Sequence, residues 1–283
     1  MNVLITGASG LVGRQLAERL KDDFEVLALT HRALDITDRD AVFERLAIAK
    51  PSLVINCAVI PVDDCERDRK KADAVNFEGP RNLAEAATEF LSEFVHFSTN
   101  YVFGGLPLGR PPYTVNDIPD PINVYGETKA AGEAAVRKGC ARSYIIRTAW
   151  VYGREKENFF SSVYAALAAN RPVRAINNVW ANTTFVKDLV DRVFEILLRR
   201  RFGTYHVVNA GICSYHDFAF EAGRLAGLSR GQLKKLINAV TEEESQRPAK
   251  RPRYTPMRCL RSEEIGLPPM RDWRLALAEY VGS

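Results

Sequence analysis

The chain reads NVLITGASGLVG from residue 2 to residue 13, and this stretch decides the fold. A strand-like apolar run ends at Gly7, Gly10 and Gly13 follow, and the helical pattern LVGRQLAERLKD comes next. Gly7 allows a tight turn, Gly10 lets the backbone approach a ligand, and Gly13 lets the helix pack on the sheet. The loop amides and the helix N-terminus suit a pyrophosphate. The spacing is GxxGxxG, and with a strand before it and a helix after it, it predicts a dinucleotide site.

The first half of the chain alternates strand and helix patterns. Further Val-, Ile- and Leu-rich strands are expected at residues 24–30, 52–58, 93–99 and 143–149. Such an alternation predicts an α/β fold: a doubly wound parallel (Rossmann) sheet with helices on both faces. The pattern loosens after about residue 150, which indicates a smaller, interleaved C-terminal substrate lobe. We expect the NAD(P)-binding domain to comprise residues 1–150 plus about 171–210. The substrate lobe would then comprise about 151–170 plus 211–283.

Composition excludes several classes of protein. The chain has 283 residues, 46% of them apolar, and a net charge of +4, which is too small to imply a nucleic-acid partner. No apolar run reaches the roughly 18 residues of a membrane helix, and the first strand begins too early for a signal segment. The five cysteines form no CxxC pair, so we expect reduced thiols and no metal site. These features predict a cytoplasmic protein without a membrane partner, and they leave a homodimer open.

Basic residues gather in one C-terminal stretch. The segment QRPAKRPRYTPMR, residues 246–258, contains no acid, and its cations are Arg247, Lys250, Arg251, Arg253 and Arg258. Guanidinium groups match phosphate oxygens, so the segment could clamp the phosphates of a ligand. A solvated basic loop is an equally good interpretation.

The end of the second strand bears on the choice of cofactor. NAD-specific sites place a carboxylate there for the ribose 2′-hydroxyl, whereas this chain has Thr30, His31 and Arg32. Cations suit the extra phosphate of NADP, so NADPH is favoured and NADH stays possible. His31 and Arg32 could also be solvent-facing loop residues. Asp35 and Ile36 follow and are candidate contacts for the adenine.

A tyrosine and a lysine share one face of an expected helix. Tyr125 and Lys129 lie four residues apart in NVYGETKAAGEAA. An ammonium beside the phenol would lower its pKa from the usual value near ~10 and make it a proton donor at neutral pH. The strand at 93–99 ends at Ser98 and Thr99, and parallel sheets bind ligands at such ends. Thr99 is favoured over Ser98 to hold a substrate carbonyl, and the alternative is that both cap the turn. His96, inside that strand, is expected to be a satisfied buried imidazole.

The motifs GASGLVG, INCA, STNYVFGG, YGETK and RTAWVYG together resemble the extended short-chain dehydrogenase/reductases. Within them the chain is most similar to the dTDP-4-dehydrorhamnose reductase family, densely to about residue 160 and more loosely afterwards. The resemblance implies NADPH-dependent reduction of the 4-keto group of a nucleotide-linked 6-deoxy sugar. Thr99, Tyr125 and Lys129 would be the catalytic set. Tyr125 would give the proton, Thr99 would bind the carbonyl, and Lys129 would orient the nicotinamide ribose.

The resemblance also implies two sets of binding residues. Those for the cofactor are Gly7, Ser9, Gly10, Leu11, Val12, Gly13, His31, Arg32, Asp35, Ile36, Cys57, Ala58, Val59, Tyr125 and Lys129. Those for the substrate are Thr99, Asn100, Tyr101, Trp150, Asn158 and Arg251. Core packing is an equally good interpretation of Tyr101 and Trp150.

The chain departs from the family at two places. TNYVFGG stands where the family writes TDYVFDG, so Asn100 and Gly104 replace two aspartates. NVWANTT, residues 178–184, stands where the family writes DQxGxPT and keeps only Thr184. These changes predict a rebuilt sugar pocket. They leave open a non-catalytic, NADP-binding regulatory subunit similar to the methionine adenosyltransferase β subunit, or another nucleotide-sugar epimerase or dehydratase.

Overall fold

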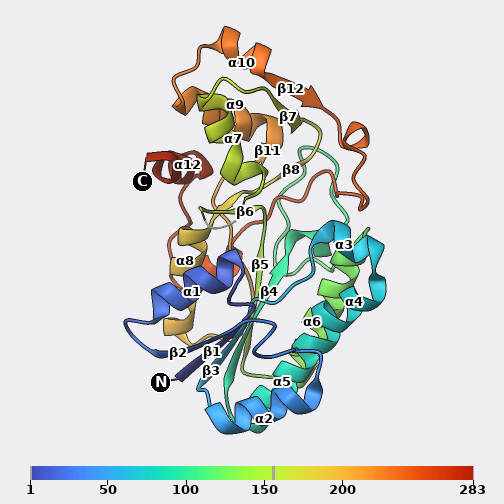
Figure 1. Ribbon diagram of the computed structural model, residues 1–283, viewed down its shortest axis with the longest axis vertical. Coiled ribbons are helices and arrows are strands. Elements are labelled where there is room, and N and C mark those ends of the chain that lie inside the picture. Colours follow the sequence, from blue (N-terminus) through green and yellow to red (C-terminus); the bar gives the residue numbers. More distant parts are fainter. Residues whose placement is uncertain (1, 155–156, 283) are drawn as a thin grey trace.

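A six-stranded parallel sheet forms the centre of the molecule (Figure 1). The computed structural model describes residues 2–154 and 157–282. The strand order is β10-β5-β4-β3-β1-β2, so the winding reverses between β1 and β3. The strands are β1 (Asn2–Thr6), β2 (Glu25–Leu29), β3 (Leu53–Asn56), β4 (Glu93–Thr99), β5 (Ser143–Thr148) and β10 (Gly203–His206). The predicted doubly wound α/β fold is confirmed, and ligands of such sheets bind where the winding reverses.

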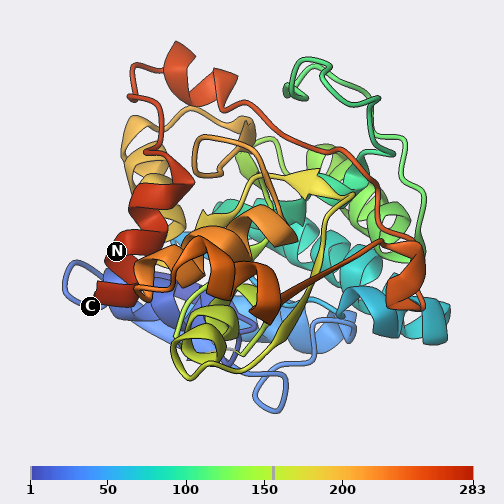
Figure 2. The same cartoon turned by 90° about the horizontal axis from the view of Figure 1, so that it is seen from above.

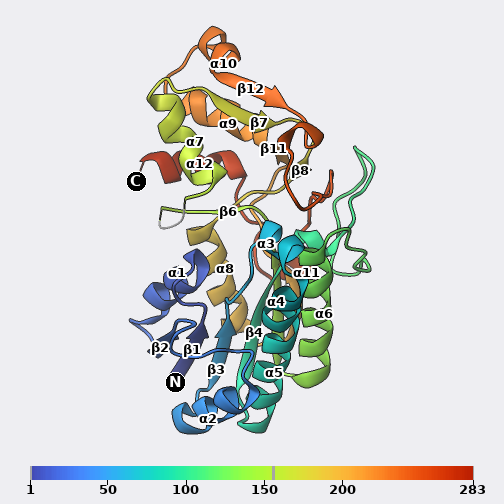
Figure 3. The same ribbon diagram turned by 45° about the vertical axis from the view of Figure 1, so that its right-hand side comes forward.

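Helices cover both faces of this sheet, as Figures 1 and 3 show. One face carries α1 (Leu11–Leu20) and α8 (Val186–Arg199), and the other carries α2 (Arg39–Ala49), α5 (Gly79–Glu89) and α6 (Val124–Gly139). Helix α8 shows the reason: Val186, Leu189, Val190, Val193 and Ile196 are buried and recur on one side of the helix. The short α3 (Val62–Arg67), α4 (Arg69–Asp73) and η1 (Ala74–Glu78) lead from β3 into α5.

A smaller lobe lies beyond the carboxyl ends of the strands (Figures 1 and 2). Its helices are α7 (Phe159–Ala168), α9 (Tyr215–Leu225), α10 (Arg230–Leu236) and α12 (Trp273–Gly282). Three two-stranded pairs accompany them: β7 (Val173–Ile176) with β12 (Ile237–Val240), β8 (Trp180–Ala181) with β11 (Cys213–Ser214), and β6 (Val151–Tyr152) with β9 (Thr184–Phe185). The short η2 (Asn100–Val102), η3 (Glu243–Ser245) and α11 (Leu260–Glu264) complete the chain. No helix within the described residues could span a membrane.

The division into two domains stays a proposal, and the pairings adjust its boundaries. Within the range 171–210 assigned to the Rossmann domain, β10 joins the central sheet but β7 pairs with β12. We therefore propose that β7 belongs with the C-terminal lobe. Residues 1, 155–156 and 283 of the predicted ranges lie outside the described residues.

Candidate active site

The glycine loop connects β1 to α1 at the point where the sheet winding reverses. Gly7 has φ +67°, and a Cβ there would lie 2.5 Å from the backbone nitrogen of Ala58. A side chain at Gly13 would meet the carbonyl oxygen of Gly7 at 2.5 Å. Gly13 thus packs the helix against the loop rather than against the sheet, which corrects the expected contact. Gly7 lets the loop pass directly over the end of β3.

The start of α1 suits an anion. Gly10 is its N-cap residue, and no side chain caps the helix. The first N–H groups of the helix are therefore available to a ligand, and the helix dipole favours negative charge there. A pyrophosphate fits this donor set.

A cleft of about 320 Å³ runs from the glycine loop along the ends of β2 and β3. Most of the residues predicted for the cofactor line it: Gly7, Ser9, Gly10, His31, Asp35, Ile36, Cys57, Ala58 and Val59. Lys71 and Val75, from the segment after β3, also line it, and the sequence analysis missed them. The cleft thus gathers residues from four separate segments at one edge of the sheet.

Six of the predicted cofactor residues do not line this cleft: Leu11, Val12, Gly13, Arg32, Tyr125 and Lys129. Leu11 and Gly13 are buried beneath the loop, and Val12 packs against the core. Arg32 lines a neighbouring hollow of about 260 Å³ together with His31 and Arg45. Asp35 accepts hydrogen bonds from the backbone and hydroxyl of Thr37, so its carboxylate is partly engaged.

Thr99 and Tyr125 come together beyond the end of β4. The hydroxyl of Thr99 caps the turn at 100–102, where it accepts from the N–H of Tyr101 at 3.1 Å and donates to Asn100 Oδ1 at 3.2 Å. The rings of Tyr101 and Tyr125 meet edge to face at 6.0 Å. Ser98 instead donates to the buried Glu133 carboxylate at 2.6 Å. Of the two hydroxyls at this strand end, the one at Thr99 lies beside Tyr125.

Lys129 is buried behind this pair. Its Nζ donates to the carbonyl of Phe97 at 2.5 Å and lies 3.3 Å from Nε2 of His96. Burial is the main cause that lowers the pKa of Lys129 to about 8, and Glu133 opposes that shift. Near neutral pH the lysine thus exists in both charge states.

The expected effect of Lys129 on the tyrosine is not what the structure shows. Burial raises the pKa of Tyr125 to about 12, and a hydrogen bond with Thr99 only partly offsets it. The ammonium of Lys129 is directed at His96 and Phe97, which explains why it does not lower the pKa of the phenol. At neutral pH Tyr125 therefore keeps its proton, as a proton donor must.

Aromatic residues border the same region on the side of the smaller lobe. Trp150 has φ +43°, a conformation that a bulky residue rarely adopts. Its ring packs on Phe160 and Tyr215, at centroid distances of 5.1 and 4.3 Å. The indole Nε1 is buried and has no hydrogen-bond partner among the described residues. Trp150 thus combines backbone strain with an unused donor, a combination that favours a binding role.

The arginines of the basic segment 246–258 are paired with acids, of which only Asp63 is distant in sequence. Arg251 contacts both oxygens of Asp63, at 2.5 and 2.9 Å. The other arginines pair as follows: Arg247 with Glu242, Arg253 with Glu243, and Arg258 with Glu263. A hollow of about 680 Å³ is lined by the segment and by the loop at 104–107. Four of the five cations of the segment therefore have an acidic partner, and Arg247, Lys250, Arg251 and Arg253 border this hollow.

The two predicted asparagines of the substrate site have different surroundings. Asn100 is buried and donates to Thr255 Oγ1 at 2.7 Å. Asn158 caps α7, where it accepts from the N–H of Ser161 and donates to the carbonyl of Val151. The amide of Asn158 is thus engaged in local structure.

On the substrate side of the site, sequence reasoning also missed Asp63, Tyr215 and Thr255. Asp63 lies 188 positions from Arg251, and its local sequence carries no sign of this pairing. Tyr215 begins a helix, and its aromatic contacts come from α7 and from Trp150, just before β6. The guanidinium of Arg247 lies 5.6 Å from the ring of Tyr215. Arg247 itself was identified in the sequence as part of the basic segment.

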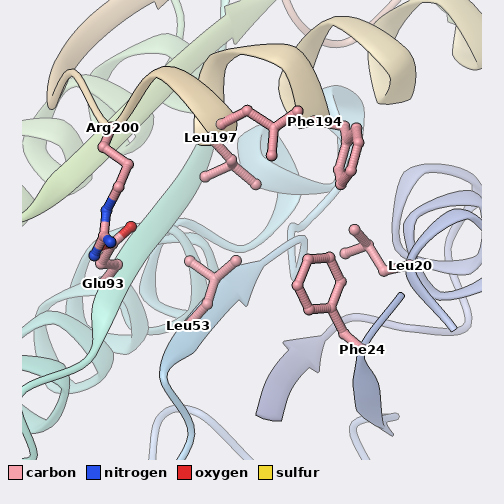
Figure 4. Close-up of a pocket in the computed structure, with 8 residues that line it drawn as sticks. Leu20, Phe24, Leu53, Glu93, Phe194, Leu197 and Arg200 are labelled. Atoms are coloured by element: carbon pink, nitrogen blue, oxygen red, sulfur yellow. The ribbon is translucent and has the colours of Figure 1, made fainter. Parts of the chain in front are cut away.

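Another hollow, of about 190 Å³, lies at the opposite ends of the strands (Figure 4). Leu20, Phe24, Leu53, Phe194 and Leu197 make it apolar, and Arg200 pairs with Glu93 beside it at 2.8 Å. Leu53 and Glu93 are the first residues of β3 and β4, so this hollow is separate from the candidate site.

The glycine loop at the reversal of the sheet, with a tyrosine and a lysine on α6, defines a short-chain dehydrogenase/reductase of the extended type. The chain belongs to the RmlD substrate binding domain family, which it matches over residues 1–283.

Two curated relatives and one solved structure illustrate the similarity. The dTDP-4-dehydrorhamnose reductase of Mycolicibacterium smegmatis is 38% identical over 99% of this chain and 85% of its own. A probable dTDP-4,6-dihydroxy-2-methyloxan-3-one 4-ketoreductase of Streptomyces antibioticus is also 38% identical, over 99% of this chain and 94% of its own. The Bacillus anthracis dTDP-4-dehydrorhamnose reductase, solved in complex with NADP, superposes with a TM-score of 0.92 at 31% identity, covering 99% of this chain and 98% of that one.

Proposed function

We propose that the chain is an oxidoreductase that reduces the 4-keto group of a dTDP-linked 6-deoxy sugar. The observation that carries the proposal is the position of Tyr125, a protonated phenol beside Thr99 at the carboxyl end of β4. The names of the two curated relatives, both reductases of dTDP-linked keto sugars, support the substrate class.

The cofactor supplies hydride to the carbonyl carbon of the sugar. Gly10 and the uncapped start of α1 would bind its pyrophosphate. Cys57, Ala58 and Val59 would lie along it, and Lys129 would orient its nicotinamide ribose. As negative charge develops on the ketone oxygen, Thr99 would hydrogen-bond it and Tyr125 would protonate it.

NADPH is the proposed cofactor. His31, Arg32 and Arg45 place three basic side chains at the hollow beside the end of β2. Such cations suit the 2′-phosphate that distinguishes NADP from NAD. The NADP complex of the Bacillus anthracis relative supports the same choice.

The nucleotide part of the substrate would occupy the hollow beside the basic segment. Its cations, Arg247, Lys250, Arg251 and Arg253, would contact the diphosphate. For this, Arg251 would share its guanidinium between Asp63 and the ligand. Tyr101, Trp150 and Tyr215 would pack against the sugar. Asn100 would contribute hydrogen bonds without the charge of the aspartate that the family has there.

The test is consumption of NADPH with a dTDP-4-keto-6-deoxy sugar, compared between the wild-type chain and Tyr125→Phe. We expect Tyr125→Phe to reduce kcat by about 10²–10⁴-fold, the usual contribution of a general acid. Tyr164→Phe, which removes a phenol from α7, is the matched control and should retain the wild-type rate. NADPH binding without turnover on any such sugar would contradict the proposal and favour the regulatory subunit that the sequence left open.

A further inference from the structure

A continuous row of buried polar groups leads from the end of β3 to Lys129. Asn56 Oδ1 accepts from the N–H of Ala58 at 3.1 Å and from the hydroxyl of Thr6 at 2.8 Å. Asn56 Nδ2 lies 3.3 Å from Nδ1 of His96, and Nε2 of His96 lies 3.3 Å from Lys129 Nζ. His96, Asn56 and Lys129 are each at most 2% exposed.

The backbone fixes the direction of the first bonds in this row. An amide N–H can only donate, so the atom of Asn56 that faces Ala58 must be the oxygen. The nitrogen of Asn56 therefore faces His96, and it too can only donate. Nδ1 of His96 must accept this bond, so it carries no proton.

The position of the imidazole proton follows from this acceptor. Burial, with Lys129 as a lesser cause, holds the pKa of His96 well below its usual value, so the ring is neutral at neutral pH. A neutral imidazole carries one proton, and with Nδ1 accepting, that proton must be on Nε2. Nε2 then presents an N–H to Lys129 Nζ. An ammonium also offers only donors, so two donors would face each other across 3.3 Å.

We propose that His96 is a positioning residue that controls the protonation of Lys129, because its Asn56-fixed tautomer presents an N–H to a neutral lysine amine. The lone pair of that amine accepts the N–H of His96, while its own N–H donates to the carbonyl of Phe97. The ammonium form of Lys129 faces an acceptor on His96 only when Asn56 rotates away and the imidazole proton moves to Nδ1, so the Nε2–H tautomer disfavours that form.

The other charged or titratable groups around Lys129 do not reverse this direction. Glu133, on the same helix, favours the ammonium, but it pairs with Arg147 at 2.7 Å. The thiols Cys57, at the end of β3, and Cys65, on α3, also face Lys129, and burial raises the pKa of both, so they are uncharged at neutral pH. His96 is thus the nearest polar side chain with a fixed direction.

The role of the Asn56–His96 pair in catalysis rests on the proposed function, because Lys129 belongs to the proposed active site. There, the charge of Lys129 would act on the nicotinamide ribose of the cofactor. The Asn56–His96 pair would make that charge depend on the rotation of one buried amide.

The experiment is nitrogen NMR of the full chain labelled with ¹⁵N-histidine, which distinguishes the two neutral tautomers. We expect His96 to be the neutral Nε2–H form at pH 7. His206 is an internal reference of the opposite form, since Arg147 faces its Nε2 at 3.4 Å and can only donate. A signal for His96 with the proton on Nδ1, or on both nitrogens, would overturn the proposal without the need for any variant.

Asn56→Asp tests the direction of the row. A carboxylate still accepts from Ala58 and Thr6 but also accepts from an imidazole N–H, so His96 should change to the Nδ1–H form. The midpoint of Lys129, followed by ¹³C NMR of labelled lysines, should then rise by about one pH unit or more. Thr6→Val is the matched control, because it removes a donor to the same oxygen and should leave the tautomer unchanged.

An Asn56→Asp protein that keeps the Nε2–H tautomer would show that Asn56 does not set the direction, and the proposal would fail. If this variant does not fold, the wild-type spectrum alone decides. These measurements need no turnover, so a chain that fails to reduce any keto sugar would overturn only the proposed function.

Discussion

At the scale of single residues, the buried pair of Glu133 and Arg147 supports the strand end from behind. Arg147 donates two parallel hydrogen bonds to the carboxylate, at 2.8 and 2.7 Å, and Ser98 donates a third. Both charged side chains are at most 3% exposed. Removing one partner leaves the other charge buried without compensation, which is the costly way to break such a pair.

We expect Glu133→Gln to lower the free energy of unfolding at pH 7 by about 3–5 kcal/mol. Urea denaturation measures this. Glu127→Gln, on the same helix, is the matched control, since its pair with Arg69 is exposed on both sides and should contribute less than about 1 kcal/mol. Equal losses for the two variants would show that burial does not decide the cost.

The same pair predicts a pH dependence. Burial alone would raise the pKa of Glu133, but the hydrogen bonds from Arg147 outweigh it and lower the pKa. The stabilisation is then complete above the unfolded-state pKa near ~4.3, and it is lost as the pH falls through the lower folded-state pKa. Denaturation from pH 7 to pH 3 should therefore show the wild-type chain approaching Glu133→Gln in stability only below about pH 4.3. A constant difference over that range would contradict the assignment.

At the scale of elements, two glycines of the loop have different roles: Gly7 is needed for folding and Gly10 for binding. Gly7→Ala forces a left-handed φ on alanine, at a cost of about 1–2 kcal/mol, and also places a Cβ 2.5 Å from the backbone of Cys57 and Ala58, just after β3. A Cβ at Gly10 would meet only the carbonyl of Gly7, at 3.3 Å. We expect Gly7→Ala to lose stability and cofactor affinity together. Gly10→Ala should keep stability within about 1 kcal/mol and raise the NADPH Kd about tenfold or more. Thermal unfolding and NADPH titration of both variants check this.

In the segment 178–184, where the chain departs from its family, one buried side chain connects two other segments of the chain. Asn182 is buried, donates to the carbonyls of Asn209 and Gly211, and accepts from the N–H of Met257. Asn182→Ala leaves these three backbone groups without their partner, so we expect a loss of about 1–3 kcal/mol in the free energy of unfolding. Asn178→Ala, at a half-buried position in the same segment, should cost less. A larger loss for Asn178→Ala than for Asn182→Ala in urea denaturation would show that the contacts of Asn182 do not stabilise this region.

The elements differ in how far the sequence predicts them. The strand, the glycines and α1 are local patterns, so the cleft and most of its predicted lining follow from the sequence. The acid that pairs with Arg251 lies 188 positions away, and a sequence pattern does not show which distant side chains the fold brings together. The buried state of His96 follows from its strand, but its tautomer follows only from the neighbours that the fold supplies.

At the scale of the whole molecule, one hydrophobic core runs from the sheet into the smaller lobe. The same cluster contains Val3 and Ile5 of β1, Phe218 of α9 and Trp273 of α12. Phe218 is fully buried and contacts the rings of Tyr152, Phe160 and Trp273. The lobe therefore shares its apolar contacts with the sheet, and we expect the two to unfold together.

Calorimetry should accordingly show one transition, with equal calorimetric and van't Hoff enthalpies. Phe218→Ala removes a core ring of the lobe at a cost of about 3–5 kcal/mol, and it should move that single transition to lower temperature. NADPH binds the other half of the molecule, and at about 100 times its Kd it should increase the free energy of unfolding by about 2.7 kcal/mol. It should therefore move the same transition to higher temperature in both proteins. Two transitions, of which Phe218→Ala moves one and NADPH the other, would show that the lobes fold as separate domains.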